Sequence, residues 1–73
     1  MKAGDLVGAF PPGGLARKLK AWSAWNDTMK FFEVPYAATG TVIEVLVSGD
    51  SEWCKVLFPQ GLGWVMSDSL ELL

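Results

Sequence analysis

The sequence predicts an all-β protein: a small antiparallel barrel of about five strands, with a long, partly helical insertion between the first two strands. Two observations lead to this expectation. After Gly40, short runs of β-branched and aromatic residues alternate with turns rich in Gly, Pro, Ser and Asp, which is typical of strands joined tightly. The chain has 73 residues, so we expect one domain over 1–73, and closing a small sheet into a barrel removes its exposed edges.

The first expected strand is short and is followed by the insertion. It covers Gly4–Gly8, and the sequence FPPGG at Phe10–Gly14 ends it, because proline removes a backbone donor and glycine favours turns. The insertion spans residues 9–39. A connection longer than about 12 to 15 residues is usually functional or disordered, and this one is too rich in aromatic residues to be disordered.

Inside the insertion, the spacing of apolar residues predicts a helix. The expected helix covers Leu15–Asn26. Its apolar stripe holds Leu15, Leu19 and Trp22 at i, i+4 and i+7 and continues to Met29 at i+14, while Arg17 and Lys20 project from the opposite side. The following stretch, Met29–Ala38, is expected to be extended, because Pro35 disfavours helical geometry in the residue before it.

The remaining elements follow from alternation and turn chemistry. The expected order is a strand at Thr41–Ser48, a turn at Gly49–Ser51, a strand at Glu52–Phe58, a turn at Pro59–Gly63, a strand at Trp64–Met66, a turn at Ser67–Ser69 and a closing strand at Leu70–Leu73. Simple alternation places Cys54 on the same face as Val56. It also turns Val42 and Leu46 away from Val45, so that the outer side of the sheet requires a cover.

Composition excludes several functions. Hydrophobic residues make up 51% of the chain, with four Trp and four Phe, which favours a packed protein with apolar surface left for a partner. No apolar run approaches the roughly 20 residues of a membrane helix, and the start lacks the features of a signal peptide. We therefore expect a protein that is not secreted and has no membrane segment.

The chain also lacks the residues of most catalytic and metal sites. It has one Cys and no His, which excludes an internal disulfide, histidine-dependent catalysis and common zinc sites. Its carboxylates are scattered, and its glycine-rich stretches lack the Lys and Ser/Thr of a phosphate loop. We expect no enzyme activity, no cofactor and no metal, with Cys54 acting as a small buried hydrophobe.

The closing segment resembles a known family. The sequences GDLV, GTVIEV, KVLF and GWVMSDSLELL together are similar to an SH3-like barrel, in which the last segment passes through a 3₁₀ turn into the final strand. Peptide-binding SH3 domains have Pro where this chain has Met66 and Tyr where it has Ser69, so the resemblance does not imply polyproline binding. The order of motifs most resembles short SH3-like barrels of tailed bacteriophages. It also resembles barrel subunits that serve as adaptors in larger complexes.

That resemblance implies a non-catalytic protein-interaction module, a phage virion or accessory protein located in the virion or the host cytoplasm. We expect partner binding through the aromatic and basic residues of the insertion, because Trp, Phe and Arg are enriched at interfaces. The candidate residues are Arg17, Lys20, Trp22, Trp25, Phe31 and Phe32. For Trp22 and Trp25, a role as a lid over the sheet is the open alternative, and self-association of the chain also remains open.

A second class of partner is left open by the charge. The net charge is −2, but the insertion holds four cationic and two acidic residues. An acidic body disfavours duplex nucleic acid, whereas cations beside Trp22 and Trp25 are suited to single strands. The alternatives are thus a nucleic-acid-binding barrel and an adaptor subunit of a host enzyme or redox complex. Trp53 and Trp64, on neighbouring expected strands, either form an exposed aromatic pair or are packed in the core or half-buried.

Overall fold

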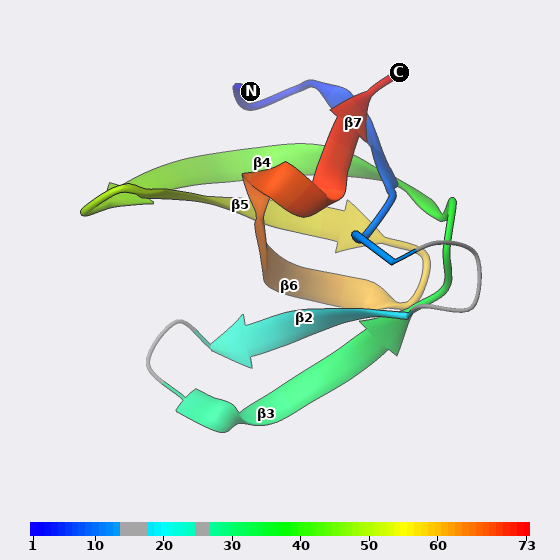
Figure 1. Ribbon diagram of the computed structural model, residues 1–73, viewed down its shortest axis with the longest axis horizontal. Coiled ribbons are helices and arrows are strands. Elements are labelled where there is room, and N and C mark those ends of the chain that lie inside the picture. The colour runs from blue at the N-terminus through cyan, green and yellow to red at the C-terminus, as the bar shows by residue number, and fades with distance from the viewer. Residues whose placement is uncertain (14–17, 25–26) are drawn as a thin grey trace.

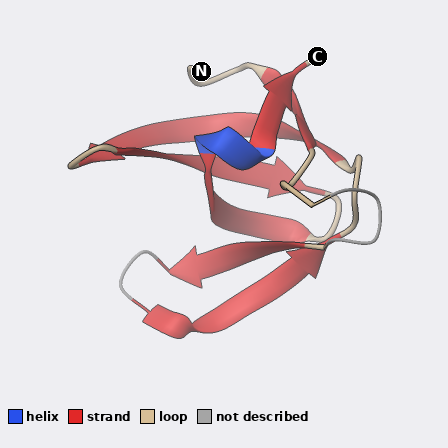
Figure 2. Ribbon diagram, in the orientation of Figure 1, coloured by secondary structure: helices blue, strands red, loops and turns tan. Residues whose placement is uncertain are grey.

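Every strand in the computed structural model belongs to one antiparallel sheet, in the order β3-β2-β6-β5-β4-β1-β7 (Figure 1). The structure describes residues 1–13, 18–24 and 27–73. The elements are β1 (Leu6–Ala9), β2 (Leu19–Ala24), β3 (Asp27–Val34), β4 (Thr39–Ser48), β5 (Ser51–Phe58), β6 (Gly61–Met66), the 3₁₀ turn η1 (Ser67–Ser69) and β7 (Leu70–Leu72). Across these residues η1 is the one helical element (Figure 2).

The all-β prediction is confirmed, but the closed barrel of about five strands is wrong. The sheet is open, with β3 at one edge and β7 at the other. The two additional strands, β2 and β3, come from the insertion and continue the sheet beyond β6. They join β6 through the pair Trp22 and Trp64, so the position beside β6 is taken by β2 and is not left for β7.

The core explains why the sheet curls. All seven strands contribute to one cluster of buried side chains on one face of the sheet: Val7, Ala9, Leu19, Ala21, Val34, Val42, Cys54, Val56, Phe58, Val65 and Leu70. Seven strands laid flat would span about 29 Å between the outermost strands, at ~4.8 Å per spacing. Side chains from both edges meet in one cluster only if the sheet bends around it, as Figure 1 shows.

The helix predicted over Leu15–Asn26 is wrong where the structure describes it. Leu19–Ala24 is strand β2, paired with β3. Along it Leu19 and Ala21 are buried and Lys20 is exposed, which is the alternation of a strand with one face in a core. Leu19 and Trp22 therefore lie on opposite faces and form no common stripe. Burial of Leu19 and Ala21 in the shared core outweighs the local helical spacing, because tertiary packing decides such ambiguous segments.

The prediction that Met29–Ala38 is extended is confirmed as far as Val34, where β3 ends. The next residues form a turn in which the Ala38 N–H donates to the Pro35 carbonyl at 3.1 Å. Ala37 has a positive φ of 68°. Its N–H donates to the Ala9 carbonyl at 2.7 Å, and the Ala9 N–H donates to Ala38 at 2.8 Å. The turn is thus fastened to the end of β1.

The second half of the chain follows the predicted order of strands and turns, with one difference in β4. The pairing register shifts between Val42 and Glu44, since Val42 lies opposite Val56 and Glu44 lies opposite Lys55. A β-bulge of this kind adds one residue to a strand and reverses the alternation beyond it. Val42 and Val45 consequently both face the core, so the prediction that Val42 points away from Val45 is wrong.

Candidate interaction surface

Four of the six residues predicted to bind a partner lie on the β2–β3 hairpin. Lys20 and Trp22 are on β2, and Phe31 and Phe32 are on β3. The register pairs Ala21 with Phe32 and Trp22 with Phe31. The other two predicted residues, Arg17 and Trp25, lie outside the described residues.

The two phenylalanines point to opposite faces of the sheet. Phe32 shares the face of Ala21 and packs against the core cluster. A β-carbon built onto Gly63 would lie 2.9 Å from the Phe32 ring, so this ring occupies the space that the glycine leaves on β6. Phe32 therefore attaches the hairpin to the sheet, and Phe31, 44% exposed, is available to solvent on the other face.

Trp22 and Phe31 begin a row of side chains that crosses four strands on the face opposite the core. Register pairs Phe31 with Trp22, Trp22 with Trp64, and Trp64 with Lys55. We call Phe31, Trp22, Trp64 and Lys55 the outer row. The Trp22 and Phe31 rings meet edge to face, with centroids 5.2 Å apart at 60°, an arrangement that contributes about 0.5 to 1.5 kcal/mol beyond burial.

Trp64 shows how closely this row is packed. Its side chain is only 8% exposed although it does not belong to the core cluster. Strand alternation on β6 puts it on the same face as Leu62 and Met66, both of which are exposed. Trp64 is therefore a buried ring within the outer row, with exposed apolar neighbours on the same strand.

Two lysines place their ammonium groups over rings of the outer row. Lys20 Nζ lies 4.9 Å from the centroid of Phe31, and Lys55 Nζ lies 5.9 Å from that of Trp64. Cation–π contacts at exposed sites contribute about 0.5 to 1 kcal/mol each. In the strand register, Glu33 lies opposite Lys20 and Glu44 lies opposite Lys55. The surface is therefore amphipathic, with aromatic rings at its centre and charges of both signs around them.

The sequence pattern identified Trp22, Phe31 and Lys20 but did not identify Trp64 and Lys55 as their neighbours. The pair Trp22 and Trp64 joins strands that are far apart in the chain. The alternation predicted along β5, with Cys54 and Val56 on one face, is confirmed. No local signal indicates which strand will lie beside β6. Trp53 lies on the same outer face, half-buried and opposite Met66, which agrees with the half-buried alternative.

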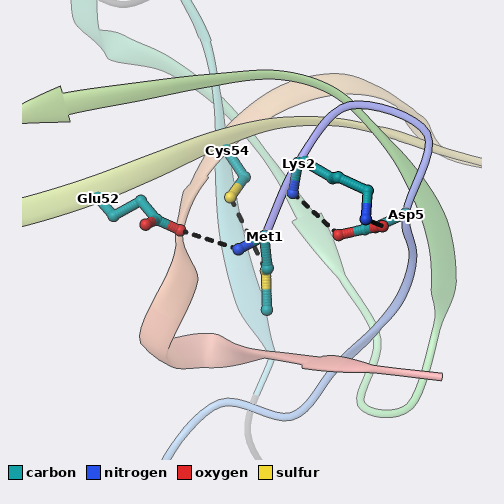
Figure 3. Close-up of polar contacts among 5 residues, drawn as sticks. All are labelled: Met1, Lys2, Asp5, Glu52 and Cys54. Atoms are coloured by element: carbon teal, nitrogen blue, oxygen red, sulfur yellow. Dashed lines mark hydrogen bonds and ion pairs between the residues drawn. The ribbon is translucent and has the colours of Figure 1, made fainter.

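The single thiol belongs to the core cluster, on the face opposite the outer row, and lies beside the amino-terminal residue Met1 (Figure 3). Cys54 Sγ is 3.9 Å from Met1 Sδ, and the terminal ammonium is 3.7 Å from Glu52 Oε1. Lys2 donates its backbone N–H to Asp5 at 2.9 Å. Burial raises the pKa of the Cys54 thiol, the negative charges of Glu52 and Asp5 raise it further, and the terminal ammonium opposes them. The thiol is therefore protonated near neutral pH, the form that is a poor nucleophile.

Within the described ranges, no group of three His, Cys, Asp or Glu side chains is placed to hold a metal ion. The same residues include no helix that is long and apolar enough to cross a membrane.

Comparison of the chain with protein-family models, with curated proteins and with solved structures finds no match.

Proposed function

We propose that this chain is a non-catalytic protein-interaction module that docks onto a larger protein through the outer row. The observation that carries the proposal is Phe31, an aromatic ring left 44% exposed yet in contact with both the Trp22 ring and the Lys20 ammonium group. Aromatic side chains are enriched at protein interfaces.

The hairpin supports this role because its shape is set before any partner binds. Phe32 packs over Gly63 on β6, and the Trp22–Phe31 contact fixes the exposed ring. The partner then binds a surface that is already ordered in the free protein, so less conformational entropy is lost on association. A standard interface buries ~800 Å² on each partner, roughly a sixth to a fifth of the 4507 Å² accessible surface of this chain.

The kind of partner is proposed from the resemblance to SH3-like barrels of tailed bacteriophages. In support, a 3₁₀ turn at Ser67–Ser69 leads directly into the last strand, the ending expected of such a fold. The strand order β7-β1-β4-β5-β6 forms the main sheet, and the hairpin is the addition. We place the chain in a virion or in the host cytoplasm, bound to a virion or host protein as a structural or accessory subunit.

A pull-down from source lysate and from purified particles tests the proposal. The bait is compared with Phe31→Thr, which removes the exposed ring and keeps a residue suited to strands. The matched control is Leu6→Thr on β1, where the removed side chain is 58% exposed and which is separated from β3 by four strands in the sheet. Circular dichroism first establishes that both variants are folded. We expect one stoichiometric partner that the wild type and Leu6→Thr retain and Phe31→Thr loses. Retention by all three baits would contradict the proposal.

Single-stranded nucleic acid is a second candidate because Lys20 lies beside the exposed ring of Phe31 and Lys55 beside the buried ring of Trp64. Such binding combines stacking with phosphate contacts and weakens steeply as salt rises. Titration of labelled oligonucleotides at low and moderate salt separates the two candidates. If an oligonucleotide binds tightly, with strong salt dependence, and Phe31→Thr abolishes this binding, the partner is a nucleic acid and not a protein.

A further inference from the structure

Strand β3 is an edge of the sheet. In the described part of the chain it pairs with β2 alone. Alternate residues of an edge strand direct their N–H and C=O groups outward, which makes the edge a template for another strand. The pairing with β2 is regular from Leu19 to Trp22, opposite Phe31–Val34, and becomes irregular beyond Trp22. Phe31–Val34 is therefore the stretch with the geometry to accept a further strand.

The charge around this edge is distinct from that of the remaining chain. Among the described residues of this region, Lys18, Lys20 and Lys30 are exposed together with a single exposed carboxylate, Glu33. Outside residues 9–39, the chain has four more acidic than cationic residues. A segment rich in Asp or Glu is attracted to this edge and repelled by the rest of the surface, which restricts where it binds.

A second copy of the chain is a poorer match to the same edge. Pairing two β3 strands would bring Lys30 of both copies to one seam, with Lys20 of each copy one strand away on β2, and like charges on neighbouring strands are destabilising. An acidic segment replaces that repulsion with attraction.

We infer that the β3 edge binds an acidic, extended segment of the partner protein as an added strand. The backbone of the segment pairs with Phe31–Val34. Carboxylates on its outer face reach Lys20, and carboxylates on its other face reach Lys30. Its apolar side chains on the outer face extend the contact with Phe31, since residues opposite each other on neighbouring strands share a face. The inference rests on the proposed function and specifies the chemistry of the partner and its mode of binding.

Nuclear magnetic resonance titration tests the inference on the intact, ¹⁵N-labelled chain. The probe is the capped peptide Glu-Glu-Val-Val-Glu-Glu, which as a strand presents carboxylates and a valine on each face, and the control is its counterpart with Lys in place of Glu. We expect the acidic peptide to shift the amide signals of Phe31–Val34 and to slow hydrogen exchange of the outward amides of β3, because strand addition gives them new acceptors. The lysine peptide is expected to do neither.

Charge variants add a second readout. Lys20→Gln and Lys30→Gln are each expected to weaken binding of the acidic peptide roughly twofold to fivefold, the range for exposed ion pairs, while Lys2→Gln, far from the edge, leaves it unchanged. Equal binding of both peptides, or shifts without slower amide exchange in β3, would overturn strand addition. Concentration-dependent protection of β3 without any peptide would indicate a second copy instead.

The two proposals fail separately. Loss of the lysate partner on Phe31→Thr, together with no response to the acidic peptide, would reject strand addition and leave the protein interaction standing. Retention of that partner by Phe31→Thr, together with a full response to the peptide, would reject the outer row as the working surface and leave the edge.

Discussion

The attachment of the β2–β3 hairpin to β6 depends on a missing side chain, and Gly63→Ala tests it directly. A β-carbon at this position would lie 2.8 Å from Ala21 Cβ and 2.9 Å from Phe32 Cε1, closer than carbon atoms in contact normally approach. Gly63 has no positive φ that would disfavour alanine. The substitution therefore isolates the steric effect.

The magnitude follows from two opposing contributions. Overpacking a well-filled site costs about 1 to 3 kcal/mol. Replacing glycine where the backbone is compatible restores about 0.4 to 1 kcal/mol by restricting the unfolded chain. We expect a net loss of about 1 to 2 kcal/mol in the free energy of unfolding. For a domain of this size, that corresponds to a decrease in Tm of roughly 5 to 15 °C.

Thermal and urea unfolding followed by circular dichroism measure the loss, and a double-mutant cycle assigns it. Phe32→Leu removes the ring atoms that the new methyl group would meet, so the double variant is expected to be more stable than the sum of the two single effects by about 1 kcal/mol. A Gly63→Ala variant as stable as the wild type, or effects that simply add, would show that the hairpin does not pack on β6 as described.

Three further predictions concern other parts of the chain. Ala37→Gly is expected to raise the free energy of unfolding by up to about 1 kcal/mol in urea melts, because Ala37 has a φ of 68°, a conformation that costs alanine more than glycine; a less stable variant would contradict the turn. Burial raises the pKa of Cys54, so the folded state holds its proton more tightly and stability should fall as pH rises above the thiol's unfolded pKa of about 8.5. Unfolding measured from pH 7 to 10 should show a shallower decline for Cys54→Ala; equal slopes would refute this. Phe31→Thr should cost about 1 to 2.5 kcal/mol in thermal melts, since the ring is 44% exposed and the substitution removes its contacts with Trp22 and Lys20; a cost of about 3 to 5 kcal/mol, as for a buried Phe, would place the ring in the core.

The second half of the fold was predictable because its information is local. In β5, the alternation of Cys54, Val56 and Phe58 with exposed or half-buried residues is complete, and glycine and proline mark the turns around it. One bulge in β4 was enough to reverse the expected facing of Val42 relative to Val45, because a bulge has no clear signature in a run of β-branched residues.

The helix predicted in the insertion is wrong because the apolar residues there fit both the helical and the strand period. Leu19 and Trp22 are three residues apart, as on one side of a helix, yet Leu19 and Ala21 also alternate as in a strand. What decides between them is the packing of Phe32 on Gly63 and the pairing of Trp22 with Trp64. These contacts join segments some thirty or more positions apart, so no local pattern contains them. For the same reason, of the outer row only Phe31 and Trp22, on the hairpin, could be predicted as binding residues, and Trp64 and Lys55 could not.

The affinity of the captured partner for wild type, Phe31→Thr and Leu6→Thr tests the central claim most directly. Measured by calorimetry at fixed salt, the Kd for Phe31→Thr should rise at least about 30-fold, the effect of losing a hot-spot residue worth about 2 kcal/mol. Leu6→Thr should remain within about twofold of wild type, because surface changes outside an interface have little effect on binding. Equal affinities for wild type and Phe31→Thr would show that the partner binds elsewhere on the sheet.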